Sequence, residues 1–177
     1  MEYWDLYDQN RNLTGKTIVR GESIPKGFYH LVVHVCIFNS KGEMLIQQRQ
    51  PFKKGWSNMW DLTVGGSAQA GDTSRKAAER EVFEELGYKI NLDNERPIMT
   101  IPFGVGYDDM YVIEADLNLD ELKLQYEEVQ QVKWATKDDI FQMLKVGTFI
   151  PYHQSLIELL FELRITRDAH HNLNKQK

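Results

Sequence analysis

The chain has 177 residues but only one cysteine, Cys36, and five prolines. A single cysteine excludes an intrachain disulfide and any cluster of thiolate metal ligands, which is typical of a reducing compartment. No stretch approaches the roughly 18 uncharged apolar residues of a membrane-spanning helix. The longest apolar run, residues 31–38, is interrupted by His34. The N terminus has no basic segment followed by an apolar one, so no signal peptide is expected. These absences predict a soluble cytoplasmic protein.

Positive charge is also scarce, because the formal net charge is −5. This balance gives no general attraction to nucleic acid polymers or to anionic membranes. An acidic protein can still bind a polyanionic phosphate where a metal cation mediates the contact. The chain is long enough for one domain with a sizeable core and short for two. It contains no internal repeat and no low-complexity segment.

Apolar and β-branched runs bounded by turn residues predict strands. We assign strands to residues 3–7, 16–20, 30–38, 44–49, 60–64, 97–103, 110–116 and 129–135. Helical composition with capping residues predicts helices at residues 74–86, 137–145 and 152–164. Residues 30–38 and 44–49 are expected to form a hairpin. Mixed strands and helices around one core predict an α/β (α+β) fold, a sandwich with a mixed central sheet between helices.

The predicted helix at residues 74–86 carries three carboxylates on one face. Glu81, Glu84 and Glu85 follow the i, i+3, i+4 spacing of neighbours on a helix surface. Three anions within one turn repel one another unless a cation lies between them. Carboxylate oxygens suit a hard ion such as Mg²⁺ or Mn²⁺ better than zinc. The alternative is a solvated, Glu-rich helix, which an isolated motif of this kind does not exclude.

The same helix has an apolar face and clear ends. Ala78, Val82 and Leu86 repeat every fourth residue and are expected to pack on a sheet. Thr73 or Asp72 offers an N-cap, and Gly87 offers a C-terminal stop. The carboxylates are therefore expected to face outward while the apolar stripe faces inward.

The segment before the helix supplies glycines and a second charged pair. Gly65 and Gly66 close the predicted strand at residues 60–64, where a missing Cβ lets the backbone approach a metal or a phosphate. Arg80 lies eight residues after Asp72 and can reach back to it. Such an ion pair would brace the loop against the helix.

Taken together, Gly66, Asp72 and residues 80–88 (REVFEELGY) resemble the Nudix box of the Nudix hydrolases. The match covers the leading glycine, the Arg-Glu pair, the apolar residue, the Glu-Glu pair, the following glycine and the final hydrophobic residue. One position departs from the pattern, because the family usually has Glu where this chain has Asp72. That position is structural in the family, so the shorter carboxylate is expected to weaken the brace more than the chemistry.

The resemblance implies a Nudix α/β/α sandwich over residues 28–168, after a strand-like extension at residues 1–27 and before a disordered tail at residues 169–177. It implies that Glu81, Glu84 and Glu85 bind Mg²⁺, with Mn²⁺ as a substitute, and that a backbone carbonyl near Gly65 and Gly66 is a further ligand. The metal would shield phosphate charge and lower the pKa of a bound water. Glu84 and Glu85 are also candidate catalytic residues.

Many members of the family recruit another carboxylate from a loop before a late strand. Glu128, with Glu127 beside it, lies six residues before Trp134 in such a place. It is a candidate metal ligand or general base, and the alternative is a pair of exposed loop glutamates. Asp108 and Asp109, on a predicted Gly-rich turn, are weaker candidates.

An aromatic and basic cluster precedes the box. From it we assign Arg49, Lys53, Lys54 and Trp56 as candidate substrate-binding residues. In isolation this composition would indicate core aromatics and solvated charges. Beside a metal site, these side chains are suited to contact phosphates, or to stack on the rest of the substrate together with Phe52.

The stretch from His30 to Tyr88 is similar to the Nudix branch that includes the type I isopentenyl-diphosphate isomerases. Those enzymes protonate a carbon with a Cys in the segment leading into the box, where this chain has Gly65, and Ser67 stands where they have a metal-binding His. Glycine cannot protonate a carbon, and Cys36 lies within an apolar strand where a cysteine is usually a core residue. His30 and His34 share one side of that strand, and with no third ligand nearby they favour core or edge positions over a metal pair.

We therefore predict a Mg²⁺-dependent Nudix hydrolase that cleaves a phosphoanhydride bond in a nucleoside-diphosphate-linked or other X-diphosphate metabolite. Its expected partner is this small molecule, with no nucleic acid polymer and no membrane, and it is expected to be a monomer or a homodimer. Two alternatives stay open. One is a relative of the isopentenyl-diphosphate isomerases, and the other is a non-catalytic, ligand-binding Nudix domain, which would not need the complete set of carboxylates.

Overall fold

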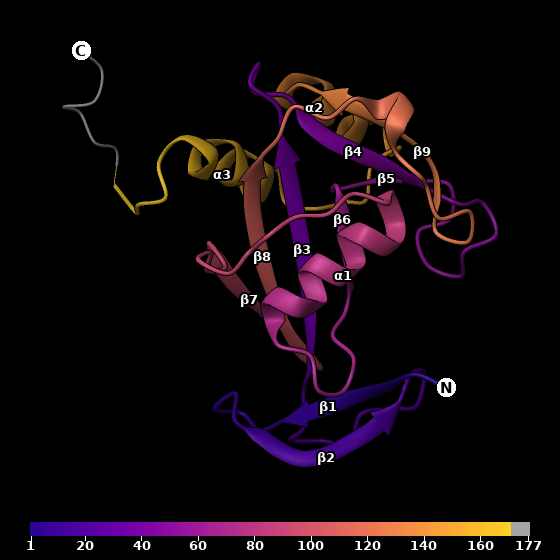
Figure 1. The fold of residues 1–177 in the computed structure, drawn as a ribbon, viewed down its shortest axis with the longest axis vertical. Helices are drawn as coiled ribbons and strands as arrows, with labels where there is room; N and C mark the ends of the chain where they lie inside the picture. The colour runs from indigo at the N-terminus through magenta and orange to yellow at the C-terminus, as the bar shows by residue number, and fades with distance from the viewer. Residues whose placement is uncertain (171–177) are drawn as a thin grey trace.

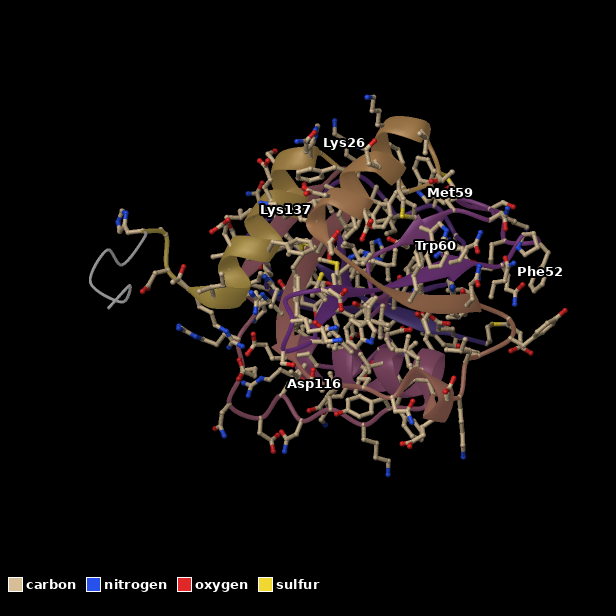
Figure 2. The ribbon with its side chains drawn as sticks, turned by 90° about the horizontal axis from the view of Figure 1, so that it is seen from above. Lys26, Phe52, Met59, Trp60, Asp116 and Lys137 are labelled. Carbon is tan, nitrogen blue, oxygen red and sulfur yellow. The ribbon has the colours of Figure 1, made fainter. Side chains whose placement is uncertain are left out.

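The structure is a computed structural model that describes residues 1–170. Its strands are β1 (Tyr3–Tyr7), β2 (Leu13–Val19), β3 (His30–Phe38), β4 (Met44–Arg49), β5 (Trp60–Asp61), β6 (Val64–Ser67), β7 (Met99–Phe103), β8 (Gly106–Glu114) and β9 (Val129–Ala135). Its helices are α1 (Ser74–Leu86), the 3₁₀ turn η1 (Leu119–Glu121), α2 (Lys137–Val146) and α3 (Gln154–Ile165). Figure 2 shows the sheet between α1 on one side and α2 with α3 on the other.

The central sheet is mixed, as predicted. Strands β5, β4, β3, β8 and β7 lie side by side in that order, while β6 pairs with β3 and β9 pairs with β4. Strand β3 runs parallel to β8 and antiparallel to β4 and β6. The architecture confirms the predicted α/β sandwich with a mixed central sheet.

Strand β3 is buried on both faces, which explains its almost continuous β-branched and apolar sequence. Val33, Val35 and Ile37 belong to the core cluster that also contains residues of α1. Cys36 and Phe38 belong to the cluster on the opposite face, which contains residues of α2 and α3. Cys36 is fully buried, so the prediction of a core cysteine is confirmed.

Helix α1 has the predicted bounds because its local signals are complete. Thr73 caps the N terminus, where its side chain accepts a hydrogen bond from the backbone N–H of Lys76 at 3.3 Å. Gly87 ends the helix in the left-handed conformation, with φ at +66°, which favours glycine. Ala78 and Val82 are fully buried, so the predicted apolar face does pack on the sheet.

Strands β1 and β2 form a two-stranded sheet of their own. Figure 1 shows this hairpin below α1, with the N terminus on the same side of the molecule as the loops that precede β5 and β9. Tyr7 exchanges backbone hydrogen bonds with Tyr29 at 2.8 and 3.0 Å. The backbone N–H of Ala70 donates to the carbonyl oxygen of Tyr3 at 2.8 Å. The hairpin is therefore attached both to the start of β3 and to the loop that leads into α1.

Two strand predictions were wrong at the level of detail. The predicted strand at residues 60–64 is two short strands, β5 and β6. Between them, the Thr63 hydroxyl accepts a hydrogen bond from the Ile37 N–H at 2.9 Å and donates one to the Leu45 carbonyl, in place of a regular strand pairing. The predicted turn around residues 104–109 is shorter, because β8 begins at Gly106, where it pairs in parallel with β3. Asp108 and Asp109 therefore lie within the sheet and not on a turn.

Smaller differences concern element ends. The second strand spans Leu13–Val19 instead of residues 16–20, and the last helix spans Gln154–Ile165 instead of residues 152–164. Most of the predicted tail at residues 169–177 lies outside the described residues. Within residues 1–170, none of the helices combines the length and the apolar character that crossing a bilayer requires.

The packing of α1 gives a stability prediction. Leu86 is fully buried in the core cluster under α1, so Leu86→Ala should lower the free energy of unfolding by about 2–5 kcal/mol. Urea denaturation measures the change. The control is Leu159→Ala on α3, whose side chain is 44% exposed, and which should have a much smaller effect. Equal losses in the two variants would contradict the packing described for α1.

Candidate active site

A polar cavity of about 250 Å³ lies where the hairpin, α1, β6 and the loop before β9 meet. Most of the predicted site residues line it, namely Arg49, Lys53, Gly65, Gly66, Arg80, Glu81, Glu84, Glu85 and Glu128. Predicted residues that do not line it are Lys54, Trp56 and Asp72. Lining residues that sequence reasoning missed are Glu2, Arg20, Ser67, Gln69 and Gln125.

Glu81 lies directly on the backbone of β6. A Cβ added at Gly66 would collide with the Glu81 carboxyl group, so a larger residue there would displace this side chain. Burial raises the pKa of Glu81 above its ordinary value, against the opposing charge of Arg80. The close approach brings the Glu81 carboxyl group to the backbone at Gly66, where the family resemblance implies a carbonyl ligand.

Glu85 differs from the outward orientation that the sequence predicts. It is only 5% exposed, and its Oε2 accepts a hydrogen bond from Gln47 Nε2 of β4 at 2.9 Å. The chain after η1 also covers the end of α1, since the backbone N–H of Gln125 donates to the Glu85 carbonyl at 3.0 Å. Burial, followed by the charge of Glu81, raises the pKa of Glu85 well above its ordinary value.

Arg80 connects the loop before α1 to the acidic face of the helix. Its Nη2 and Nε donate to one oxygen of Asp72, at 3.0 and 3.2 Å, and Nη2 also donates to the Ser67 carbonyl at 3.1 Å. Its Nη1 donates to Glu81 at 2.8 Å and to Glu84 at 3.1 Å. One guanidinium group thus fixes β6, the loop and two carboxylates relative to one another.

Glu128 enters the cavity from the loop before β9. Lys53 Nζ contacts both of its carboxylate oxygens, at 2.6 and 2.5 Å. The backbone N–H of Gln50 also donates to the Glu128 carbonyl at 3.1 Å. The loop after β4 and the loop before β9 are thereby joined at the cavity wall, which brings a predicted phosphate-binding lysine and a predicted catalytic carboxylate together.

The donor set of this cavity fits a hard divalent cation. Among residues 1–170, no group of three or more acidic, cysteine or histidine side chains already converges on one point, and Arg80 binds both Glu81 and Glu84. Burial raises the pKa of both Glu81 and Glu85, so a cation held between them would offset the cost of keeping them ionised. Within the described residues, the buried Gln47 Oε1 beside Glu85 also has no hydrogen-bond partner.

His34 and Gly65 face each other across the β3–β6 pair. A Cβ at Gly65 would lie 2.5 Å from Cδ2 and Nε2 of the His34 ring. The ring is held in place because Nδ1 lies 2.9 Å from Asp108 Oδ1, and its edge packs against Tyr152. His30 instead stacks on Trp4 and is 6% exposed, so the two histidines have separate surroundings and largely buried positions.

The remaining candidates have structural contacts outside the cavity. Asp109 is fully buried and accepts hydrogen bonds from Thr100 Oγ1 at 2.6 Å and from Arg11. Tyr107, next to Asp108 on β8, donates its hydroxyl to the Asp8 carbonyl at 2.9 Å and so holds the hairpin. Trp56 is half exposed in the loop after β4, where its φ of +51° is unusual for a residue other than glycine.

The NUDIX domain model matches residues 28–159. The chain belongs to the Nudix family. It is 51% identical over 170 residues to a Nudix hydrolase of Listeria innocua, covering 96% of this chain and 99% of that protein. It is 29% identical over 154 residues to an isopentenyl-diphosphate Delta-isomerase of Pectobacterium atrosepticum, covering 78% of this chain and 79% of that protein.

Among solved structures, the protein DR0079 of Deinococcus radiodurans has the same fold. The TM-score is 0.71 at 23% identity, over 91% of this chain and 98% of that one. These matches confirm the predictions of a Nudix-type fold, of a likeness to the isomerase branch and of a Nudix pyrophosphohydrolase. The roles of the individual site residues stay predictions.

The contact between His34 and Gly65 gives a testable coupling. Gly65→Ala should lower the free energy of unfolding by about 1–3 kcal/mol, because the new methyl group overlaps the His34 ring. In a His34→Ala background the same change should cost less, with a coupling energy of about 0.5–3 kcal/mol. Denaturation of the single and double variants measures this energy. Gly104→Ala is the control, since a Cβ there meets no atom within 4 Å. Additive effects would show that the ring does not occupy this space.

Proposed function

We propose that this Nudix protein hydrolyses a phosphoanhydride bond in a small diphosphate-containing metabolite, with Mg²⁺ as its cofactor. The observation that carries the proposal is that Glu81, Glu84, Glu85 and Glu128 line the same cavity as Lys53. Carboxylates for a hard cation and basic groups for phosphate oxygens are the two components that phosphoryl transfer to water requires.

Glu81, Glu84 and Glu85 are the side chains that would hold the metal, together with a backbone carbonyl at Gly65 or Gly66. A bound divalent cation supplies charge shielding on the phosphates and activation of the attacking water. Glu81 lies against the backbone at Gly66, and Glu85 is anchored by Gln47, so these two ligands are oriented before any substrate arrives. Glu84, whose side chain is 43% exposed, has more freedom to adjust.

A carboxylate of the same cavity accepts the proton of the attacking water. The oxygen of this water forms a bond to phosphorus. The bond between phosphorus and the bridging oxygen breaks, and the leaving group keeps the bonding electrons on that oxygen. Glu84, Glu85 and Glu128 are the candidates for this base. Lys53 and Arg49, which line the cavity, would neutralise phosphate charge.

The group attached to the diphosphate is proposed to lie toward the loop after β4. Phe52 and Tyr126 are exposed and pack on each other, with ring centroids 5.7 Å apart. Each is next in sequence to a residue that lines the cavity, Lys53 and Gln125 respectively. Figure 2 shows Phe52 at the outer edge of the molecule. This arrangement supports a substrate with an aromatic X group, such as a nucleoside-diphosphate-linked metabolite.

Two observations argue against the isomerase alternative, although relatives with that name are similar to the chain. Gly65 offers no acid at the position of the isomerase cysteine. The His34 ring also fills the volume that a side chain at residue 65 would occupy. A non-catalytic binding domain is the other alternative, and it would bind a diphosphate without releasing phosphate.

A panel of nucleoside diphosphates, nucleotide sugars and other X-diphosphates, assayed for product with and without Mg²⁺, tests the proposal. We expect hydrolysis of at least one class, loss of activity in EDTA and recovery on addition of Mg²⁺ or Mn²⁺. Binding of a diphosphate with no cleavage product would instead identify a binding domain. Rearrangement of isopentenyl diphosphate without release of phosphate would identify an isomerase.

Glu85→Gln is the variant that tests the site most directly. Turnover should fall by orders of magnitude, because a metal ligand and candidate base is lost. The fold should persist, because the amide has nearly the same shape as the buried carboxyl group. Steady-state kinetics measure the change, and Glu158→Gln, an exposed position on α3, is the matched control. Full activity of Glu85→Gln would contradict the assignment.

The same variant has an expected stability profile in metal-free buffer. The pKa of Glu85 is raised in the folded protein, so its contribution to stability is complete below the ordinary value and declines as the pH rises through the raised one. Glutamine does not ionise. As the pH rises above the ordinary range of a glutamate carboxyl group, urea denaturation should therefore show a smaller loss of stability for Glu85→Gln than for the unmodified protein.

A further inference from the structure

The hairpin outside the matched family segment contributes two charged side chains to the cavity. Arg20 follows β2 and Glu2 precedes β1, and both line the cavity with Glu81, Glu85 and Glu128. The NUDIX match begins at residue 28, so neither residue belongs to it. An inference about them rests on the function proposed above and concerns how the same site holds its substrate.

Arg20 is fixed in position by a short chain of contacts. Its backbone N–H donates to the Glu2 carbonyl at 2.9 Å, and its Nη1 donates to Glu2 Oε2 at 2.7 Å. The other oxygen of Glu2 accepts a hydrogen bond from Trp4 Nε1 at 2.8 Å. The Trp4 ring stacks on His30, with centroids 4.5 Å apart and planes 17° from parallel. Arg20 is thereby tied to the first residue of β3.

The guanidinium group of Arg20 faces the acidic part of the cavity. The hydrogen bond to Glu2 raises its pKa most, and burial opposes this shift. The charges of Glu2, Glu128 and Glu81 raise the pKa further. Two of these acids belong to the predicted metal and catalytic set. Arg20 is therefore close enough to Glu81 and Glu128 to interact with their charges across the cavity.

Among the cations that line the cavity, Arg80 and Lys53 are engaged by carboxylates of the site, whereas Arg20 and Arg49 each donate a single side-chain hydrogen bond within residues 1–170. Arg80 makes five hydrogen bonds to Asp72, Ser67 and the acidic face of α1. Lys53 is paired with Glu128, and Arg49 Nε donates to the Gly55 carbonyl at 3.1 Å. Within residues 1–170, Nη2 and Nε of Arg20 have no hydrogen-bond acceptor, and the side chain is 57% exposed.

We propose that Arg20 is a substrate-binding residue whose free guanidinium donors bind oxygens of the substrate diphosphate, and that Glu2 is its positioning residue. A planar guanidinium suits this role, because two parallel N–H groups match two oxygens of one phosphate. The contact involves the diphosphate and not the X group. Loss of Arg20 should therefore weaken substrates with different X groups by similar factors.

A counter-charge role makes the opposite prediction. If Arg20 only balanced the charge of the acidic cluster, its removal would make the net charge of the cavity more negative. Mg²⁺ would then bind more tightly, while affinity for a diphosphate would stay the same. The two roles are separable because the metal and the diphosphate have opposite charges.

The test is the variant Arg20→Gln in the full chain. Calorimetry in the presence of Mg²⁺ measures the binding of methylenediphosphonate, a diphosphate analogue that cannot be hydrolysed. We expect about 10- to 100-fold weaker binding, the range for loss of hydrogen bonds between charged groups. In turnover, KM should rise by a similar factor and kcat should change less. Lys16→Gln is the control, since it removes the same charge from β2, where the ammonium group lies over Phe28.

Two further variants keep the test decisive. Arg20→Lys retains the charge without the planar donor pair, so it should bind the probe with intermediate affinity even if Arg20→Gln is poorly folded. Glu2→Gln should weaken binding less than Arg20→Gln does. It should cause no additional loss in the Arg20→Gln background, because it acts through Arg20. A separate, additive loss would overturn the positioning role of Glu2.

Failure of this inference differs from failure of the proposed function. If the unmodified chain shows Mg²⁺-dependent hydrolysis and Arg20→Gln binds methylenediphosphonate as tightly as Lys16→Gln does, the inference is wrong and the function stands. Tighter Mg²⁺ binding with unchanged diphosphonate affinity would also overturn it in favour of a counter-charge. Absence of hydrolysis in the unmodified chain, with Glu85→Gln indistinguishable from it, would overturn the proposed function.

Discussion

The ion-pair network of Arg80 is the constraint on which the rest of the site depends. It joins the end of β6, the loop before α1 and two glutamates of the helix through one guanidinium group. The shorter carboxylate of Asp72 still takes part, because both Nε and Nη2 reach the same Oδ2 atom. That oxygen also accepts the backbone N–H of Gln69 at 3.1 Å. The replacement of Glu by Asp is therefore accommodated by one oxygen that serves the loop and the helix together.

The acidic face of α1 lies at the boundary between core and solvent instead of on an open surface. Val82 and Leu86 are fully buried on the apolar side, while Glu85 is buried on the acidic side by Gln47 and by the chain after η1. An uncompensated buried carboxylate is destabilising, so the divalent cation proposed for this site would offset that cost on binding. Apolar packing at Val82 and Leu86 stabilises the helix, while the buried charge at Glu85 destabilises it, and all three residues lie within about one turn of α1.

Local signals allowed much of this to be predicted from the sequence, and non-local ones explain what was missed. Thr73 and Gly87 define the ends of α1 through contacts within a few residues, so its bounds were predictable. The start of β8 at Gly106 depends on a parallel pairing with β3. The burial of Glu85 depends on contacts with Gln47 and Gln125, which are far from it in the sequence. Glu2 and Arg20 reach the cavity only because the hairpin docks on Tyr29 and on the loop before α1. No local pattern around either residue indicates that contact.

The pairing of Gly65 with His34 suggests how one scaffold can serve hydrolases and isomerases at about 29% identity. A side chain at residue 65 would overlap the His34 ring, and that ring is held by Asp108 on β8 and packs against Tyr152. Introducing the acid that carbon protonation needs would therefore require a coordinated change on β3, β6 and β8. A single substitution at residue 65 meets an occupied volume. Because close-packed interiors resist such overlap, a change at residue 65 of this chain is coupled to the residues that hold the His34 ring.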